Sequence, residues 1–233
     1  MTPHYRRALI VGAGSGLSAS LAQLLSASGL RVGLAARSTD KLADLAGETG
    51  AATHACDASK PDEVERLFSA MEGALGGAPD VVVYNASGRL RGPVVELDPA
   101  AVAQALAVSA YGGFLVAQAA ARRMLPEGHG AILLTGASAS IKGFAGSAPF
   151  AMGKFALRGL GESLARELAP KGIHVVHFVI DGGIRSASRA VPDDQPDSLL
   201  DPDAIARIYK GALDQDRSAW SSEIAVRPWV ERF

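Results

Sequence analysis

The sequence predicts an α/β protein built on a doubly wound parallel sheet with helices on both faces. Apolar runs of strand length alternate with segments of helical periodicity along nearly the whole chain. A glycine-rich turn, Gly12-Ala13-Gly14-Ser15-Gly16, separates the first apolar run from the first helical segment. Polar or charged residues follow most of the apolar runs, where the carboxyl ends of parallel strands would share one edge of the sheet.

The N-terminal part of the chain alternates strands and helices. Residues 8–11 are four consecutive apolar residues and predict a buried strand, and the Ala/Leu-rich residues 18–27 predict a helix. Residues 31–36 form a second apolar run and predict a strand that ends at Arg37. A helix carrying Lys41, Leu42 and Leu45 follows, and residues 51–56 predict the third strand.

The middle of the chain contains the longest predicted helix. Residues 61–75 predict a helix, because proline suits the first helical position and apolar residues recur on one face. Residues 80–85 predict a strand with an apolar middle that stops at the polar Asn85, and the apolar run 131–134 predicts another. Between them, residues 99–124 predict a long helix, and residues 101–121 are apolar nearly all round it. A helix without a polar face must be covered on both sides, so we expect part of it to lie in a subunit interface.

The C-terminal part of the chain completes the alternation. Residues 150–169 predict a helix whose three glycines permit close approach of another helix, and residues 173–180 predict a strand. Residues 201–212 predict a short helix and residues 223–226 an edge strand. We expect residues 187–200, rich in Pro, Asp and Ser, to form a mobile loop near the substrate. Residues 218–233 would form the last strand and a tail whose aromatic residues dock on the body of the protein or on a neighbouring subunit. The alternative is that they pack on their own sheet.

Composition limits the partners and the compartment. At 233 residues we expect a single domain spanning 1–233, and a net charge of −1 argues against nucleic acid and anionic membranes as partners. The single cysteine, Cys56, excludes an intrachain disulfide and suits a reducing compartment. We see neither a signal peptide nor a run approaching a membrane span, which predicts a cytoplasmic protein. The histidines are scattered, so we predict no metal site.

The glycine turn before a helix is typical of a dinucleotide site, because backbone N–H groups and the helix N-terminus face the phosphates. In such folds an acidic residue about twenty positions past the glycines binds the ribose 2′-hydroxyl of NAD. Here that position holds Arg37, whose guanidinium can pair with a 2′-phosphate. We therefore predict NADP(H) rather than NAD(H). The alternative is a solvated arginine at the start of a helix.

Several motifs together carry a family resemblance. Gly12-x-x-x-Gly16-x-Ser18 stands where short-chain dehydrogenases/reductases have Gly-x-x-x-Gly-x-Gly, and Tyr84-Asn85-Ala86-Ser87 stands for Asn-Asn-Ala-Gly. The segment 181–186, Asp-Gly-Gly-Ile-Arg-Ser, resembles the family's Pro-Gly-x-Ile-x-Thr, and Asp57 stands where an acidic residue meets the adenine. The resemblance implies a Rossmann-like sheet of about seven strands in the order 3-2-1-4-5-6-7. It also implies a small-molecule substrate and a homodimer or homotetramer.

Together these observations predict the residues that bind the cofactor. They are Gly12, Gly14, Ser15, Gly16, Leu17, Arg37, Asp57, Ala58, Asn85, Ala86, Ser87, Val108, Lys154, Ile184 and Ser186.

The family's catalytic signature is altered. Its Tyr-x-x-x-Lys appears as Phe150-Ala151-Met152-Gly153-Lys154, which keeps both ends on one helical face but replaces the proton-exchanging hydroxyl by a phenyl ring. The family's helix asparagine falls on Ser109. Its serine falls on Ala137, with Ser138 one residue away. The resemblance therefore assigns catalysis to Lys154, Ser138 and Ser109. Other possible proton donors are Ser140, Ser147, Tyr111, a bound water or the substrate itself.

These observations leave three functions open. The first is an NADP(H)-dependent oxidoreductase that acts on a small carbonyl, alcohol or activated double bond with a non-standard proton donor. The second is a catalytically silent NADP(H)-binding protein, a sensor or partner subunit. The third is another reaction on the same scaffold. The first two differ in whether a proton donor lies near the nicotinamide.

Overall fold

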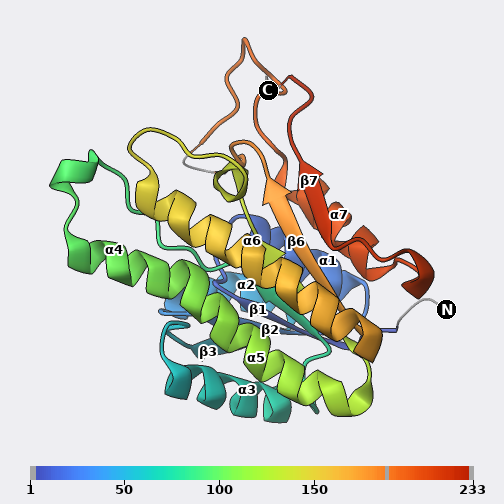
Figure 1. The fold of residues 1–233 in the computed structure, drawn as a ribbon. Helices are drawn as coiled ribbons and strands as arrows, with labels where there is room; N and C mark the ends of the chain where they lie inside the picture. The colour runs from blue at the N-terminus through green and yellow to red at the C-terminus, as the bar shows by residue number, and fades with distance from the viewer. Residues whose placement is uncertain (1–3, 187–188, 231–233) are drawn as a thin grey trace.

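The computed structural model describes residues 4–186 and 189–230, which form one parallel sheet flanked by helices (Figure 1). The strand order is β3-β2-β1-β4-β5-β6-β7, which confirms the order predicted from the sequence. Every pair of neighbouring strands is parallel. The strands are β1 (Arg7–Val11), β2 (Arg31–Ala36), β3 (Ala52–Ala55), β4 (Val81–Tyr84), β5 (Gly130–Thr135), β6 (Ile173–Ile180) and β7 (Glu223–Val226).

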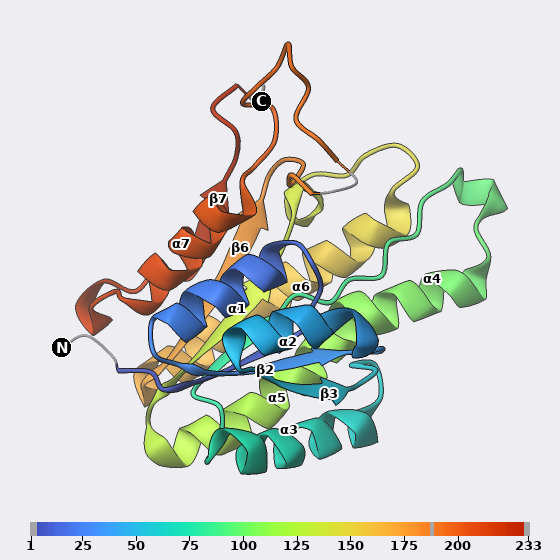
Figure 2. The same cartoon turned by 180° about the vertical axis from the view of Figure 1, so that it is seen from behind.

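Helices cover both faces of the sheet, as Figures 1 and 2 show from opposite sides. One face carries α3 (Pro61–Leu75), α4 (Pro99–Leu106), α5 (Gly112–Met124) and α6 (Ala148–Leu168). The other face carries α1 (Leu17–Ala27), α2 (Ala43–Thr49) and α7 (Pro202–Leu213). The two faces have separate apolar cores, one around the α3, α5 and α6 side chains and one around those of α1 and α7.

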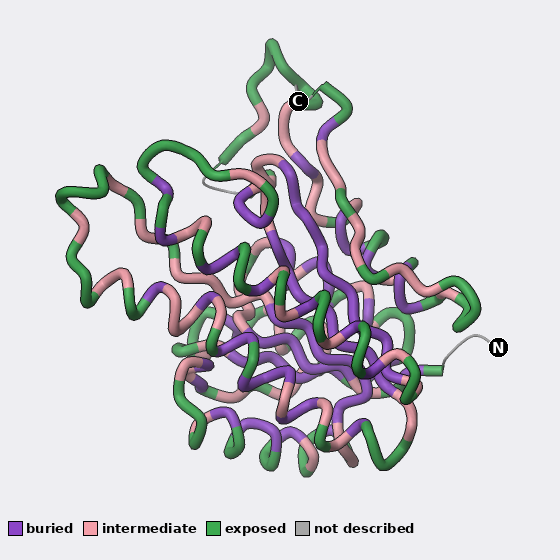
Figure 3. The backbone as a smooth tube through the Cα atoms, viewed as in Figure 1, coloured by how far each residue is buried: buried purple, intermediate pink, exposed green. Residues whose placement is uncertain are grey.

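The central strands are buried on both faces, which explains their continuous apolar sequences. Every residue of β4, β5 and β6 is buried, as the buried strands through the middle of Figure 3 show. Strands covered by helices on both sides read as apolar runs rather than as an alternation of polar and apolar residues. Because these strands are parallel, their carboxyl ends lie at one edge of the sheet.

The predicted long helix is one continuous helical run whose middle is π-helical rather than α-helical. A π-helical segment, Ala107–Tyr111, joins α4 to α5. By length and composition, Pro99–Glu127 is long and apolar enough to cross a membrane, which corrects our expectation that no segment approaches that limit. In this structure the run lies beside α6, and α5 also packs against α3, β4 and β5, as the core helix of an α/β fold does.

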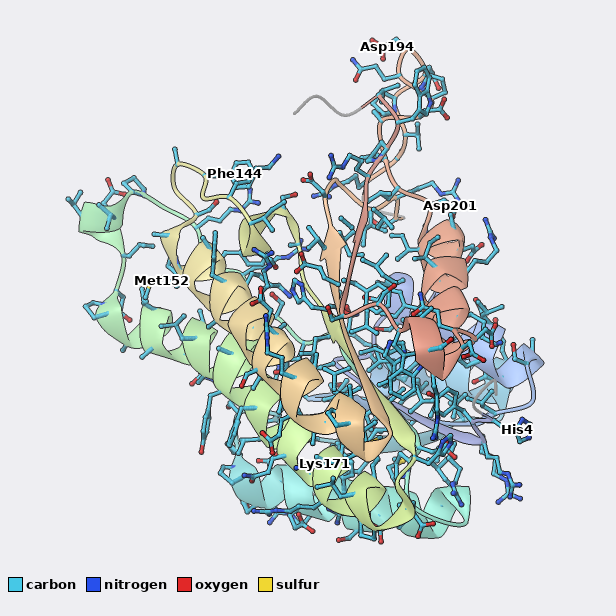
Figure 4. The ribbon with its side chains drawn as sticks, turned by 45° about the vertical axis from the view of Figure 1, so that its right-hand side comes forward. His4, Phe144, Met152, Lys171, Asp194 and Asp201 are labelled. Atoms are coloured by element: carbon cyan, nitrogen blue, oxygen red, sulfur yellow. The ribbon has the colours of Figure 1, made fainter. Side chains whose placement is uncertain are left out.

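The C-terminal part of the chain meets our expectations in part. Residues 187 and 188 of the expected loop lie outside the described residues, while Leu200 pairs with Ile184. Asp194 marks the projecting tip of this loop in Figure 4. Trp220 stacks on His174 at 4.5 Å between ring centroids, so this tryptophan docks on its own sheet. Trp229 is 81% exposed and donates a hydrogen bond to Asp197. Phe233 lies outside the described residues.

Candidate active site

A cavity of about 1100 Å³ opens at the carboxyl edge of the sheet. Every residue that the sequence predicts to bind the cofactor lines this cavity, although these residues come from seven separate segments of the chain. Phe150 and Lys154 line it as well, whereas Ser109 and Ser138 do not. The fold therefore gathers the predicted nucleotide site around one hollow.

The glycine turn after β1 shapes one wall of the cavity. Gly12 has a φ of 86°, and a Cβ on this residue would lie 2.3 Å from the backbone nitrogen of Ala86. Only glycine fits that position. A Cβ on Gly14 or Gly16 would meet nothing within 4 Å, so these glycines face open space in front of the N-terminus of α1. No side chain caps that helix end, so its N–H groups can bind an anion such as a phosphate.

Ser18, which stands where the family has its third glycine, links two loops. Its hydroxyl donates to the Gly12 carbonyl at 3.3 Å and accepts a hydrogen bond from the Asn85 side-chain nitrogen at 2.7 Å. Ser18 is 1% exposed, so these bonds replace water that the hydroxyl cannot reach. The serine thus holds the turn after β1 against the end of β4. The sequence showed Ser18 as a departure from the motif and gave no signal for this role.

Arg37 and Asp57 lie at the ends of β2 and β3 and line the same part of the cavity. The Asp57 carboxylate accepts hydrogen bonds from the backbone and hydroxyl of Ser59, and mainly these bonds hold the pKa of Asp57 below its usual value. Arg37 is exposed. Lys41, which the sequence analysis did not propose as a ligand, also lines this part of the cavity. Two cations, Arg37 and Lys41, therefore line the cavity close to the carboxyl end of β2.

Lys154 is 3% exposed and lies at the inner end of the cavity. Its Nζ donates to the carbonyl of Thr135 at 2.6 Å and lies 6.0 Å from the centroid of the Phe150 ring. Burial, with a smaller contribution from the neighbouring Arg89 charge, lowers the pKa of Lys154 to about 7. At neutral pH this amine therefore exists in both its charged and its neutral form.

The two expected serines lie outside the cavity for identifiable reasons. Ser109 is fully buried, and its hydroxyl accepts a hydrogen bond from the Gly88 backbone at 2.9 Å. Ala137 is extended, so the side chains of Ala137 and Ser138 leave the backbone on opposite sides. Ala137 lines the cavity and Ser138 does not. The geometry therefore gives no support to the expected catalytic roles of Ser109 and Ser138.

The other hydroxyls considered as proton donors are also placed elsewhere. Ser140 is buried, and its oxygen accepts a hydrogen bond from the Ala137 backbone. Ser147 is buried at the start of α6, and Tyr111 is half exposed and stacks on Phe114. None of the three lines the cavity among the described residues.

Tyr84, which replaces the first asparagine of the family motif, supports the π-helical segment. Its hydroxyl donates to the carbonyl of Val108. Gly112 allows this approach, because a Cβ there would lie 2.5 Å from the Tyr84 hydroxyl and 2.8 Å from the Ala58 carbonyl. The end of β4 thereby fixes the helical segment that brings Val108 to the cavity. A π-helical turn beside a ligand site is a recurring arrangement.

Arg89 is the main functional candidate that the sequence analysis missed. It is exposed in the loop after β4, lines the cavity, and lies 5.9 Å from the centroid of the Phe150 ring. The loop contains no recognisable motif, so apart from the charge of Arg89 the sequence gave no reason to assign this residue to the site. Gln104, Arg185 and Arg189 also line this end of the cavity.

The two histidines of β6 contact the chain at the edge strand β7. His174 bonds the Ser221 carbonyl, and His177 lies 3.1 Å from the Glu223 carboxylate beneath α6. Burial lowers the pKa of both rings. Within residues 4–186 and 189–230, no group of three His, Cys, Asp or Glu side chains gathers as a metal ion would require.

Comparison with known proteins gives consistent relatives. Residues 12–208 match a family model described as enoyl-(acyl carrier protein) reductase. An uncharacterized oxidoreductase of Staphylococcus aureus is 30% identical over 227 residues, which is 95% of this chain and 96% of the relative.

Solved structures agree with the sequence comparison. A short-chain dehydrogenase from Rhodopseudomonas palustris is 31% identical with a TM-score of 0.83, over 97% of this chain and all of that one. A metagenomic short-chain oxidoreductase solved in complex with NADP is 28% identical with a TM-score of 0.82, over 97% and 98% of the two chains. With its sheet order, its glycine turn and these relatives, the chain belongs to the short-chain dehydrogenase/reductase family.

Proposed function

We propose that this protein is an NADP(H)-dependent oxidoreductase that acts on a small carbonyl, alcohol or activated double bond, with Lys154 as its proton donor. The cofactor would lie along the cavity, with its 2′-phosphate on Arg37 and its diphosphate at the N-terminus of α1. The NADP complex of the metagenomic relative supports the choice of cofactor.

The cavity fits this group. Gly14 and Gly16 leave open the space that side chains would fill in front of α1. Ser87 lines the cavity, and its hydroxyl is buried without a hydrogen-bond partner in the described part of the chain. A buried hydroxyl without a partner is costly, so a ligand that bonds it would stabilise the site.

When bound, the cofactor would supply a hydride to the substrate carbon from its nicotinamide ring. Reduction of a carbonyl would then need one proton at the carbonyl oxygen to give the alcohol. Among this chain's residues, Lys154 would give that proton, because it lines the cavity and its Nζ lies 6.0 Å from the centroid of the ring that replaces tyrosine. A donor with a pKa of about 7 is well matched to proton transfer at neutral pH. Solvent would return the proton to the amine.

Phe150 would keep water away from the reacting groups. Its ring is half-buried, lines the cavity and lies within about 6 Å of both Lys154 and Arg89. Exclusion of water strengthens the electrostatic effect of the lysine on the carbonyl oxygen. The position of Lys154 beside this ring is the single observation that carries the proposal.

A catalytically silent NADP(H)-binding protein is the alternative, and Phe150 and Ala137 favour it because both positions lack a hydroxyl. The experiment compares wild type, Phe150→Tyr and Lys154→Met with a panel of carbonyl compounds, after NADPH binding has been measured for each by fluorescence titration. We expect the wild type to turn over, with a rate that falls above pH about 7 as Lys154 loses its proton. Lys154→Met should lose about 10²–10⁴-fold in rate.

The silent alternative makes a different prediction. If wild type and Phe150→Tyr both bind NADPH and neither oxidises it with any compound, the proposed reaction is wrong. If Lys154→Met binds NADPH and retains the wild-type rate, the proton comes from another donor.

We further propose a homodimer or homotetramer in the cytoplasm. An exposed apolar face extends across two neighbouring helical segments and consists of Tyr111, Phe114, Met152 and Phe155. Met152 points outward in Figure 4. The one cysteine is free and buried, which suits a reducing compartment.

A further inference from the structure

The cavity has an excess of positive charge at the end where Phe150 lies. Arg89, Lys154, Arg185 and Arg189 all line this end. Among the described residues that line the cavity, Asp57 is the one acidic side chain, and it lies at the opposite end with Ser59 as its partner. The charge of the substrate end is therefore not balanced by the residues that line it.

Arg89 differs from its neighbour Arg185 in having no acidic partner. Arg185 pairs with Asp201 at 2.9 Å, which compensates its charge. For Arg89, the described part of the chain provides no carboxylate within ion-pair distance, and its one close partner is the Phe150 ring at 5.9 Å from the ring centroid. A ring face attracts a cation but leaves all of its N–H groups free. A guanidinium whose N–H groups are free can donate two parallel hydrogen bonds to a carboxylate.

Lys154 and Arg89 meet at the same ring. The Lys154 nitrogen lies 6.0 Å from the centroid of Phe150 and the Arg89 carbon 5.9 Å from it. The positive charge of Arg89 contributes to the lowered pKa of Lys154, because the two cations repel each other. An anion placed between them would relieve this repulsion.

We propose that the substrate is a short oxo acid and that Arg89 binds its carboxylate. The carbonyl group would then lie toward Lys154, with Phe150 as the apolar wall beside both. Both cations lie within about 6 Å of the centroid of one ring, so a substrate of a few carbons can reach both with its carboxylate and its carbonyl. We take 2-oxo and 3-oxo acids as the simplest members of this class. This inference rests on the proposed oxidoreductase function and names the class of its substrate.

The test measures binding rather than turnover. Wild-type protein is first saturated with NADP⁺, which cannot reduce a ketone, and is then titrated in a calorimeter with 2-oxo and 3-oxo acids of three to six carbons and with their methyl esters. Arg89→Met removes the charge. Arg91→Met is the matched control, because Arg91 is an exposed arginine of the same loop that does not line the cavity.

We expect at least one acid to bind about 10- to 100-fold more tightly than its ester, as removal of a charged hydrogen bond would predict. Arg89→Met should lose that preference and keep its affinity for NADP⁺, and Arg91→Met should behave as wild type. The proposal is overturned if no acid binds, if acid and ester bind equally, if Arg89→Met keeps the preference, or if Arg91→Met loses it equally. A loss of NADP⁺ affinity in Arg89→Met would instead assign the arginine to the cofactor and also overturn it.

The two proposals fail in different ways. If wild type does not bind NADP⁺, the proposed function is wrong, and titration of the free protein with the same acids and esters still decides whether Arg89 recognises a carboxylate.

Discussion

Lys154 combines burial, a single backbone acceptor and a neighbouring cation, and this combination has a measurable consequence for stability. An unfolded lysine has a pKa of about 10.4, whereas the pKa of Lys154 in the folded protein is lowered to about 7. Between these two values the unfolded chain holds a proton that the folded chain has released. The contribution of Lys154 to the stability of the wild type should therefore rise with pH in this window.

Comparison with Lys154→Met isolates this effect between pH 7 and 9. The Lys154 charge also lowers the pKa of His177, but that pKa lies below its usual value of 6.5 and therefore outside this range. From pH 7 to 9, the Tm of the cofactor-free wild type should rise relative to that of the variant by about 2–4 °C for each kcal/mol of stability gained. The gain should be on the order of 1 kcal/mol per pH unit. A difference in Tm that does not change with pH would mean that Lys154 titrates as a solvated lysine.

At the scale of single residues, the sequence predicted which residues line the cavity better than it predicted the hydrogen bonds and contacts that they make. Arg37, Asn85 and Lys154 were predictable because each follows a strand or retains a family motif. The bond from Asn85 to Ser18 was not, because it joins residues 67 positions apart and no periodicity links them. Arg89 was missed because its role depends on a contact with a ring in another element.

At the scale of elements, α6 contains two glycines with opposite surroundings. A Cβ on Gly153 would lie 2.6 Å from the Cβ of Ser109, which its bond to Gly88 holds in place. A Cβ on Gly159 would meet nothing within 4 Å. Helix propensity favours alanine equally at both positions, so the difference between the two substitutions reports packing alone.

We expect Gly153→Ala to destabilise the protein by about 1–3 kcal/mol through overpacking. Gly159→Ala should be neutral or should stabilise it by up to about 1 kcal/mol. Midpoints of urea unfolding measure both. Equal midpoints for the two variants would show that α6 can move away from the π-helical segment without cost.

The parallel sheet was predictable from the sequence pattern, and its strand order followed from the family resemblance, but the π-helical turn in the long helix was not predictable. Apolar runs that alternate with helical segments predict a parallel sheet. The π-helical segment Ala107–Tyr111 depends on the hydroxyl of Tyr84 and on the space at Gly112, which lie on separate elements. A pattern of apolar residues along one helix does not contain that information.

At the scale of the whole molecule, the exposed face of Tyr111, Phe114, Met152 and Phe155 makes a prediction about assembly. Light scattering at micromolar concentration should give the mass of a dimer or tetramer. The double substitution Met152→Glu and Phe155→Glu should give a monomer, because burial of two unpaired carboxylates at an interface is costly. Val95→Glu is the control, since Val95 is 89% exposed in a loop away from this face. A monomeric wild type would contradict the prediction.

The most direct test of the account is calorimetric titration of the wild-type protein and Arg37→Glu with NADPH and with NADH. The arrangement of the α1 N-terminus, Arg37 and Ser87 around one cavity predicts that the wild type binds one NADPH per chain. Its affinity for NADPH should exceed that for NADH by about 10-fold or more, and Arg37→Glu should abolish or reverse the preference. Failure to bind either nucleotide, or equal affinity of the wild type for both, would contradict the account.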